Sequence, residues 1–469
     1  MAKLSLRIVK NLMKEGLKFG DVVGLVVKNT TYVAPLVLAC LLGGFPVSTL
    51  DPTFDDNEVA NIFRQTNPKM VFCDHDNFEI VVDAMEVTNN DSDIYIVDEK
   101  TTGTPHGFGI DGTKLCSVIL CSSGTTGLSK GTMLSSAQCI QMTNPFPQVL
   151  NPTFLCFSSL YWLSGFTSLM YSLANCCKRV ISRRKFSPLF MVHLIEKYKV
   201  NVIIAPPSQA ILLIQSPVMK LADLSSIRIF MIGGGALAQQ FRKSLQEHLL
   251  YGTLIFAYGM TEIGGLASMT LPFQKPSNSV GKITPNVKIK IVDEDGNILD
   301  TNDIGEIYVL SPTMFIGYAN NPEATKSSFD AYGWYKTGDL GYITVDGEIF
   351  VIDRKKEMIK YLNYQVAPSE LETFIQKIEG VKTVCVVGIP DYISGDLASA
   401  IVVKEENSYL TEQDIVDEVT RFFPQFKRLH GGVYFVDSLP ITPSGKIKKV
   451  EVRKMATQLY KVHEINGNY

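Results

Sequence analysis

The run Ser122-Ser123-Gly124-Thr125-Thr126-Gly127-Leu128-Ser129-Lys130 contains the side chains best suited to chemistry. It offers several hydroxyl groups, two glycines that let the backbone close around a ligand, and a lysine at its end. Backbone N–H groups, hydroxyls and one cation are the groups that bind a triphosphate. The spacing is not that of a Walker A loop, which has a longer spacer before its Gly-Lys pair. A surface loop rich in Ser and Gly has the same composition, so the residues alone leave both interpretations open.

Two further polar or glycine-rich segments occupy equivalent places in the chain. Gly233-Gly234-Gly235 follows the β-branched run Ile227–Ile232, and Tyr258–Glu262 follows Thr253–Ala257. The first loop likewise follows an apolar run, Ser117–Cys121. Ligands of parallel α/β sheets bind outside the carboxyl ends of the strands. We therefore expect the three loops to converge on one crevice.

The elements that would position these loops alternate between short apolar runs and amphipathic helices, such as 55–65 and 188–199. This alternation predicts βαβ units and mainly parallel sheets. The expected strands are Asp21–Val27, Phe45–Leu50, Lys69–Cys73, Ile94–Val97, Ser117–Cys121, Val200–Ala205, Ile227–Ile232 and Thr253–Ala257.

After about Gly281, the sequence pattern consists of shorter segments that are typical of strands. Charged residues cluster at Asp353–Lys360. We therefore expect an α/β protein with a large N-terminal domain of mainly parallel sheets flanked by helices, which includes a β-rich subdomain. A small, mobile α+β domain follows. The predicted boundaries are residues 1–353 and 354–469.

Composition excludes several classes of function. The 469 residues carry a net charge of −3, so the sequence lacks the excess of basic residues that is typical of nucleic-acid-binding proteins. Nine cysteines lack metal-type spacing and predict reduced thiols in a cytoplasmic compartment. The C-terminal residues Gly467-Asn468-Tyr469 are not a Ser-Lys-Leu peroxisomal signal.

No transmembrane segment or signal peptide is predicted. Met1–Gly20 alternates charged and apolar residues like an amphipathic helix. Asn29–Leu50 carries no charge but is broken by Gly and Pro, which predicts a buried helix followed by a strand. The stretch between Lys130 and Lys178 has no charge and many Ser, Asn and Gly residues. It is expected in the interior, as a wall of an apolar pocket.

Together with the first loop, a set of motifs in a fixed order resembles the adenylate-forming (AMP-binding) superfamily, which includes acyl-CoA synthetases, 4-coumarate–CoA ligases and beetle luciferases. The resemblance covers the chain from Asp21 to about Arg453. The motifs that carry it, besides Ser122–Gly131, are Gly234-Gly235-Ala236, Tyr258-Gly259-Met260-Thr261-Glu262, Gly305-Glu306-Ile307, Tyr335–Leu340, Asp353–Glu357 and Pro443-Ser444-Gly445-Lys446.

The resemblance implies a binding role for specific residues of this chain. Ser122, Ser123, Gly124, Thr125, Thr126, Gly127 and Lys130 would bind the phosphates of ATP, and Gly234, Gly235, Ala236, Tyr258 and Gly259 would frame its adenine. Asp339 and Arg354 would bind the ribose. Thr126 and Glu262 would hold Mg²⁺, a hard cation that prefers oxygen ligands. Thr261 would bind the adenylate phosphate or the substrate carboxylate.

The implied reaction has two halves. Lys446 would neutralise charge as a carboxylate attacks the α-phosphate of ATP and forms acyl-AMP and pyrophosphate. The small domain would then turn about Asp353–Lys356 and present Lys360 and Gln365 to a thiol. Lys427–Gly432 resembles the family's segment near the nucleotide of CoA, so CoA is the expected acceptor. The uncharged stretch after Lys130 favours a medium- or long-chain fatty acid as the substrate.

Four departures from the family pattern bear on this prediction. The chain begins late, so the usual N-terminal segment of the large domain is expected to be lacking. In the acyl-pocket segment Ser159–Gly165, Trp162 stands near the usual His; Ser136 also replaces a common His, and Asn363 replaces a common Gly. A luciferase-like oxygenase and a non-catalytic binding remnant are the two alternative functions.

Overall fold

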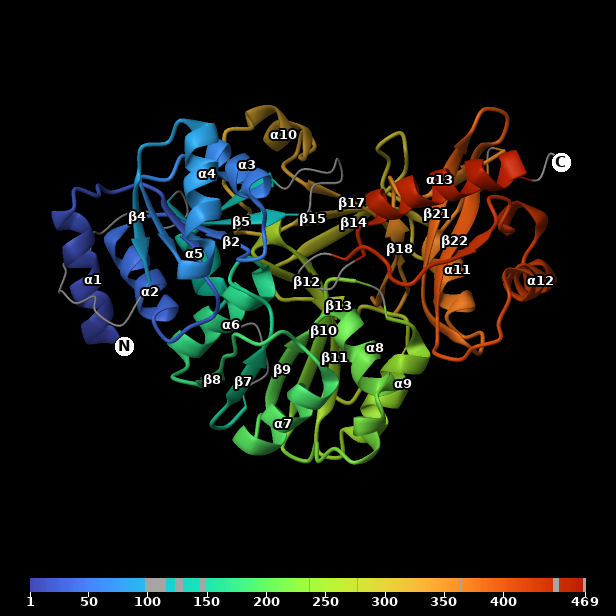
Figure 1. Ribbon diagram of the computed structural model, residues 1–469, viewed down its shortest axis with the longest axis horizontal. Coiled ribbons are helices and arrows are strands. Elements are labelled where there is room, and N and C mark those ends of the chain that lie inside the picture. Colours follow the sequence, from blue (N-terminus) through green and yellow to red (C-terminus); the bar gives the residue numbers. More distant parts are fainter. Residues whose placement is uncertain are drawn as a thin grey trace. The chain divides into compact units, whose positions relative to one another are not determined.

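The computed structural model describes residues 1–97, 115–122, 130–143, 149–235, 237–275, 277–362, 364–441 and 447–466 (Figure 1). The chain forms two compact units. The first combines Met1–Ile289 with Val309–Tyr335, and the second combines Lys290–Tyr308 with Lys336–Tyr469. Each unit has its own hydrophobic core, because separate clusters of buried side chains fill them.

The first sheet of the large unit has the strand order β16-β6-β5-β2-β1-β3-β4. Strands β1 to β5 pair in parallel, whereas β5, β6 and β16 pair antiparallel. The parallel part confirms the predicted βαβ alternation. The strands are β1 (Val23–Val26), β2 (Val47–Leu50), β3 (Met70–Cys73), β4 (Asp93–Ile96), β5 (Cys116–Ser122), β6 (Lys130–Ser135) and β16 (Gly317–Tyr318).

The second sheet has the order β13-β12-β11-β10-β9-β7-β8, with β7 to β11 parallel. The strands β12 and β13 continue it antiparallel. The sequence analysis missed β7 and β8, because both are short and lie in or next to the uncharged stretch. The strands are β7 (Thr153–Cys156), β8 (Lys178–Val180), β9 (Val202–Ala205), β10 (Ile229–Gly233), β11 (Thr253–Met260), β12 (Gly265–Met269) and β13 (Lys282–Ile283).

Helices cover both faces of the first sheet. Val23 and Leu25 of β1 lie in one core cluster with the residues of α1 and α2, whereas Val26 lies in another with those of α3 and α4. This two-sided burial explains why β1 and β3 have no polar side chain at any position. The helices of the large unit are α1 (Ala2–Lys14), α2 (Val33–Gly43), α3 (Asp56–Thr66), α4 (Phe78–Thr88), α5 (Ser136–Gln141), α6 (Leu163–Ala174), α7 (Pro188–Tyr198), α8 (Pro207–Gln215), α9 (Gln239–His248) and α10 (Pro322–Ser327); η1 (His75–Asn77), η2 (Pro217–Lys220) and η3 (Thr261–Ile263) are single turns.

The helix α6 lies between the two sheets of the large unit. Phe166 and Leu169 join the core of the first sheet, while Tyr171 packs on Phe154 in the core of the second. A helix buried on both sides cannot carry charge cheaply. This part of the uncharged stretch is therefore interior as predicted, whereas Ile140 and Leu150 of the same stretch are 68% and 87% exposed.

The second unit contains two sheets. Most of the four-stranded sheet β14-β15-β17-β18 lies in it, and a five-stranded sheet has the order β20-β19-β22-β21 with β23 beside β22. Its helices α11, α12 and α13 surround β21 and β22 (Figure 1). The elements are β14 (Lys288–Val292), β15 (Gly305–Leu310), β17 (Tyr335–Ile343), β18 (Ile349–Arg354), β19 (Ile359–Tyr361), β20 (Tyr364–Val366), α11 (Pro368–Ile375), β21 (Val381–Asp391), β22 (Gly395–Lys404), α12 (Glu412–Phe422), η4 (Gln425–Lys427), β23 (Val433–Phe435) and α13 (Lys449–Asn466).

The predicted fold class is therefore confirmed: an α/β protein with parallel-rich sheets, a β-rich part and an α+β part near the C-terminus. Within the described ranges, no helix is both long enough and apolar enough to span a membrane.

A cluster of charged side chains joins α11 and α13 of the second unit. Lys449 Nζ lies 3.1 Å from Glu357 and 3.4 Å from Glu372. Burial raises the pKa of the Glu372 carboxyl, and the surrounding carboxylates keep Lys449 charged by raising its pKa. The lysine therefore neutralises two acids at the start of α13.

Replacing Lys449 by Met tests this cluster. Because Glu372 then lacks a cation, the unfolding free energy of the second unit should fall by about 2 kcal/mol, between the values of exposed and buried ion pairs. The loss should shrink at acid pH, where Glu372 takes up a proton. Calorimetric unfolding measures both effects. Lys448→Met is the matched control, since Lys448, the residue before α13, pairs with Glu451 in the first turn of that helix; an equal loss in both variants would contradict the role of Lys449.

Candidate active site

The first predicted loop connects two antiparallel strands. Ser122 at the end of β5 pairs with Lys130 at the start of β6, so the loop closes a hairpin and does not lead into a helix. The next residue, Gly131, donates its N–H to Gln65 Oε1 at 2.9 Å, and its carbonyl accepts from Ala319. The base of the loop is therefore held by α3 and by the chain beyond β16. The residues Ser123, Gly124, Thr125, Thr126, Gly127, Leu128 and Ser129 lie outside the described ones.

Glu262 occupies the turn η3, which follows β11 of the second sheet and lies against β5 and β6 of the first. Its side chain is buried, with 6% of the residue exposed. Its backbone carbonyl accepts hydrogen bonds from Phe315 N at 2.8 Å and from Gln138 Nε2 at 3.4 Å. The turn therefore brings the predicted Mg²⁺ ligand to the edge of the sheet that carries the first loop.

Tyr318, which the sequence analysis missed, holds the Glu262 carboxylate. Its hydroxyl donates to Glu262 Oε1 at 2.8 Å, and the hydroxyl of Tyr335 lies 3.3 Å from that of Tyr318. Burial and the Glu262 carboxylate raise the pKa of Tyr335 far above its usual range, so Tyr335 stays protonated. The ammonium group of Lys130 lies over the Tyr318 ring, 4.8 Å from its centroid. Lys130, the predicted phosphate ligand, and Glu262, the predicted metal ligand, therefore both contact Tyr318.

The predicted loop Tyr258–Glu262 is corrected by the structure. Tyr258, Gly259 and Met260 continue strand β11, because the antiparallel strand β12 pairs with them across a bulge at Tyr258/Gly259. A Cβ at Gly259 would lie 2.2 Å from the carbonyl oxygen of Gly265. The glycine is therefore required by the neighbouring strand. Only Thr261 and Glu262 of the predicted loop lie in the turn itself.

The second glycine-rich loop begins beside Tyr258. Gly233 is the last residue of β10 and pairs in parallel with Ala257, the residue before Tyr258. Gly234 has φ +86°, a left-handed conformation that favours glycine. A Cβ at Gly235 would make only ordinary contact with Pro207 at 3.5 Å, so its surface is open. Ala236 lies outside the described residues.

The segment Ser159–Gly165, assigned to the acyl pocket by resemblance, leads into α6. Hydrogen bonds connect this segment to β2 and to the residue that follows β2. Thr49 Oγ1 donates to the Leu160 carbonyl at 3.0 Å, and Ser159 Oγ donates to Asp51 at 2.8 Å. A Cβ at Gly165 would lie 2.0 Å from the Ser159 carbonyl oxygen, so this tight turn requires glycine. Trp162 packs edge-on against Tyr161, with ring centroids 4.8 Å apart.

In the second unit, the two predicted ribose ligands form an ion pair. Arg354 Nε lies 2.7 Å from Asp339 Oδ1, and Asp339 is buried. Thr337 Oγ1 accepts from the Asp339 N–H at 3.0 Å, which fixes the backbone of this carboxylate. Adjacent to the pair, Lys355 binds Glu306 on β15 at 2.9 Å. The structure therefore brings Asp339 and Arg354 together as the resemblance expects.

The remaining predicted residues of the second unit lie on a hairpin. Lys360 of β19 pairs with Gln365 of β20, and both side chains are exposed. The neighbouring Tyr361 stacks on His430 at 4.4 Å, which brings the predicted CoA segment next to Lys360. Asn363 and Lys446 lie outside the described residues. Ser136 begins α5 and shares a hydrogen bond with Ser117.

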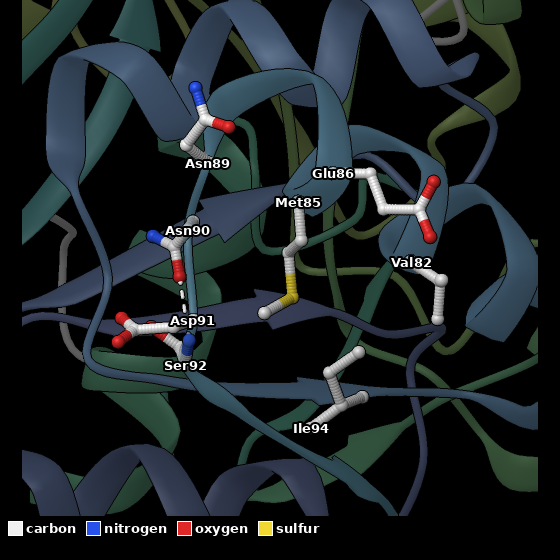
Figure 2. A pocket seen from close by; sticks show the side chains of 8 residues that line it. All are labelled: Val82, Met85, Glu86, Asn89, Asn90, Asp91, Ser92 and Ile94. Atoms are coloured by element: carbon white, nitrogen blue, oxygen red, sulfur yellow. Dashed lines mark hydrogen bonds between the residues drawn. The ribbon is translucent and has the colours of Figure 1, made fainter.

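A depression in the surface lies away from these residues. Val82, Met85 and Ile94 form its apolar part, beside the Asn- and Asp-rich turn between α4 and β4 (Figure 2). None of the predicted site residues lines it, so we do not assign the site there.

The Tyr318–Glu262 contact yields a prediction. Tyr318→Phe removes the donor but keeps the ring, so the carboxylate loses its fixed orientation. If Glu262 holds Mg²⁺, the half-saturating Mg²⁺ concentration for ATP-dependent activity should rise about tenfold. This factor corresponds to the loss of one hydrogen bond to a charged group. A magnesium titration of activity measures this. Tyr171→Phe, an equally buried tyrosine on α6, should leave the titration unchanged; an identical shift in both variants would argue against a positioning role.

The comparisons with known proteins agree with this geometry. Residues 1–319 match the model of the AMP-binding enzyme family, and residues 370–446 match that of the AMP-binding enzyme C-terminal domain. The chain is 32% identical to 4-coumarate-CoA ligase 1 of Narcissus pseudonarcissus, over 96% of this chain and 86% of the relative. It is also 32% identical to 4-coumarate–CoA ligase of Pinus taeda, over 96% and 88%.

The crystal structure of ATP-bound MatB from Rhodopseudomonas palustris is similar, with a TM-score of 0.87 and 25% identity over 97% of this chain and 92% of that one. The relatives are CoA ligases, the class of acid–thiol ligase that the sequence predicts. The chain belongs to the AMP-binding enzyme family.

Proposed function

We propose that this enzyme activates a medium- or long-chain aliphatic acid with ATP to an acyl-adenylate and transfers the acyl group to CoA. The observation that carries the proposal is the buried Glu262 carboxylate beside the end of the hairpin loop. Its neighbours are two tyrosine hydroxyls, and within the described residues no lysine or arginine forms an ion pair with it. A buried anion with no cationic partner fits a site that receives a cation with its substrate.

Mg²⁺ fits the Glu262 site. Carboxylate and hydroxyl oxygens suit this hard cation, which proteins often hold with one or two carboxylates and the substrate's phosphates. Among the described residues, no cluster of three or more His, Cys, Asp or Glu forms a complete metal cage, which agrees with a metal that arrives with ATP. Glu262 and Thr126 are the proposed ligands. When bound, Mg²⁺ supplies positive charge to the phosphates.

The nucleotide would be bound by both units. In the large unit, Ser122–Gly127 and Lys130 are proposed for the phosphates, while Gly234–Ala236, Tyr258 and Gly259 are proposed for the adenine. Gly235 supports this role because a Cβ there would make only ordinary contacts, which leaves the backbone open to close approach. In the second unit, Asp339 would accept hydrogen bonds from the ribose hydroxyls while Arg354 pairs with the same carboxylate.

In the first half-reaction, an oxygen of the acid's carboxylate attacks the α-phosphorus of ATP. A new oxygen–phosphorus bond forms, and the bond to pyrophosphate breaks. Lys446 would neutralise the two approaching anions, and Thr261 would orient the acid or the new adenylate. In the second half, the sulfur of CoA attacks the acyl carbon and AMP leaves, with the thiol proton passing to solvent.

We further propose that residues 354–469 move as one domain between the two halves. Lys446 would leave the site, and the hairpin with Lys360 and Gln365 would take its place. The exposed position of both hairpin side chains and the adjacent Tyr361–His430 stack support a role in binding CoA. The aliphatic character of the acid is supported by the uncharged, buried α6 and the apolar segment before it.

A cytoplasmic location is part of the proposal. All nine cysteines are free thiols, and most are buried. Burial raises the pKa of Cys40, Cys121 and Cys139 to about 12, so these thiols stay protonated and unreactive. This thiol content agrees with a reducing compartment.

Carboxylate-dependent exchange between ATP and pyrophosphate tests the proposed function. We expect exchange with aliphatic acids such as octanoate and hexadecanoate, and less exchange with 4-coumarate, the acid in the names of the relatives. AMP release that depends on CoA should follow the same order of acids. Exchange with none of the acids would refute the function, whereas a preference for 4-coumarate would refute only the aliphatic assignment.

Substitutions of Lys446 and Lys360 should each slow a different half-reaction. Lys446→Ala should lower adenylate formation by about a thousandfold, the scale of losing one preorganised charge, but should spare acyl transfer from preformed acyl-AMP. Lys360→Ala should slow thioester formation more than pyrophosphate exchange. Single-turnover assays of each half measure this. Lys382→Ala, which alters an exposed lysine near the start of β21, serves as a control; equal losses in both halves would contradict the division of roles.

A further inference from the structure

Arg179 is a cation inside the large unit that no part of the proposed mechanism uses. It lies on β8, the edge strand of the second sheet, opposite Phe154 of β7. Side chains two residues apart on a strand share a face, so Arg179 lies on the same face as Cys156. This is the face that packs toward α6, which also carries Tyr171 against Phe154.

One edge of the Arg179 guanidinium is buried and has no partner. The atoms Nε and Nη2 are inaccessible to solvent, and neither finds a hydrogen-bond acceptor in the part of the chain that the structure describes. These two nitrogens form one side of the planar guanidinium. Their N–H groups point in parallel, which is the fork that binds the two oxygens of a carboxylate.

Within the described ranges, no carboxylate neutralises this cation. Burial lowers the pKa of Arg179, yet a guanidinium stays charged in proteins. A Cys156 thiolate would stabilise the charged guanidinium of Arg179. Burial raises the pKa of the Cys156 thiol, however, so this thiol stays neutral. Buried polar groups without partners are rare in native proteins and usually mark a missing ion, water or ligand.

The fork lies next to the acyl-pocket segment. The Cys156 thiol, the neighbour of Arg179, shares hydrogen bonds with Ser158 and Ser164. Ser164 Oγ donates to Ser158 Oγ at 3.0 Å, and Asn29 Nδ2 donates to the Ser158 carbonyl at 3.2 Å. Ser164 belongs to Ser159–Gly165. A chain bound along this segment can therefore bring its far end close to Arg179.

We propose that Arg179 is a binding site for a carboxylate, and that the preferred acid carries a second carboxylate at its far end. This inference rests on the proposed function and specifies its substrate class as an aliphatic dicarboxylic acid. The first carboxylate reacts with ATP, while the Nε–Nη2 edge of Arg179 binds the second. A free small carboxylate from solution has the same chemistry, and the experiment below distinguishes the two sources.

Octanoate and octanedioate, which differ only in the second carboxylate, are the probes in ATP–pyrophosphate exchange. Wild-type enzyme should have a KM for octanedioate about tenfold below that for octanoate, the scale of a charge-assisted fork. Arg179→Met, which has a similar length but no charge, should raise the KM for octanedioate about tenfold and leave that for octanoate unchanged. Arg179→Lys should restore part of the preference.

Lys178→Met is the matched control, because Lys178 is the exposed neighbour on the same strand. It should change neither KM. Thermal unfolding adds a readout that is independent of catalysis: octanedioate should raise the melting temperature of the wild type but not of Arg179→Met. Protection of the wild type by acetate as strong as by octanedioate, with no difference between the two KM values, would identify a free anion and overturn the substrate assignment.

Two other outcomes are decisive. If Arg179→Met is more stable than the wild type and keeps both KM values, the cation is an unpaired core residue and the site does not exist. If octanoate supports exchange while octanedioate does not, the inference fails and the proposed function stands. Absence of exchange with every acid would instead refute the proposed function itself.

Discussion

A buried carboxylate between two sheets is the constraint on which the large unit depends. Removing Glu262 from water is costly unless hydrogen bonds compensate for the lost hydration. The chain meets this requirement with Tyr318 from β16, which also pairs with β6, and with Phe315, whose N–H binds the Glu262 backbone. Because β6 begins at Lys130, the same contacts place this lysine over the ring of the tyrosine that binds the carboxylate.

In the second unit, the buried carboxylates form ion pairs with cationic side chains. Asp339 already has a cationic partner in Arg354, and Lys449 serves two acids at once. An ion pair of this kind can accept a neutral ligand such as a sugar hydroxyl without a change of charge. Glu262, in contrast, has hydroxyl neighbours and no ion pair within the described residues. Hydroxyl groups therefore stabilise the buried carboxylate of the large unit, whereas a cation stabilises that of the second.

The shared fold leaves the choice of acid to a few side chains. A TM-score of 0.87 at 25% identity to ATP-bound MatB means that most positions differ while the backbone is kept. Around the segment Ser159–Gly165, the backbone is determined by tight packing, as the close approach of Gly165 to Ser159 shows. Differences between relatives must then come from the side chains that surround it, among which Trp162 and Arg179 are notable for their size and charge.

Much of this protein was predictable from local pattern. All eight expected strands are present, because strands buried on both faces need continuous apolar runs bounded by turn residues. The motif order also singled out Glu262, Asp339 and Arg354, because the resemblance extends over nearly the whole chain; their binding roles stay predictions. Predictions of this kind depend on residues that are close in sequence or that recur in a known order.

Tertiary structure alone decided the rest. Tyr318 lies 56 residues from Glu262, and no local spacing marks it as a partner. Tyr258–Met260 resembles a loop in sequence, but the pairing of β12 makes it strand. Arg179 has the sequence context of an ordinary surface charge, and only the packing of β8 on β7 and α6 buries its fork. Local sequence sets which elements form, whereas burial and long-range contacts set the charge environment that gives a side chain its chemistry.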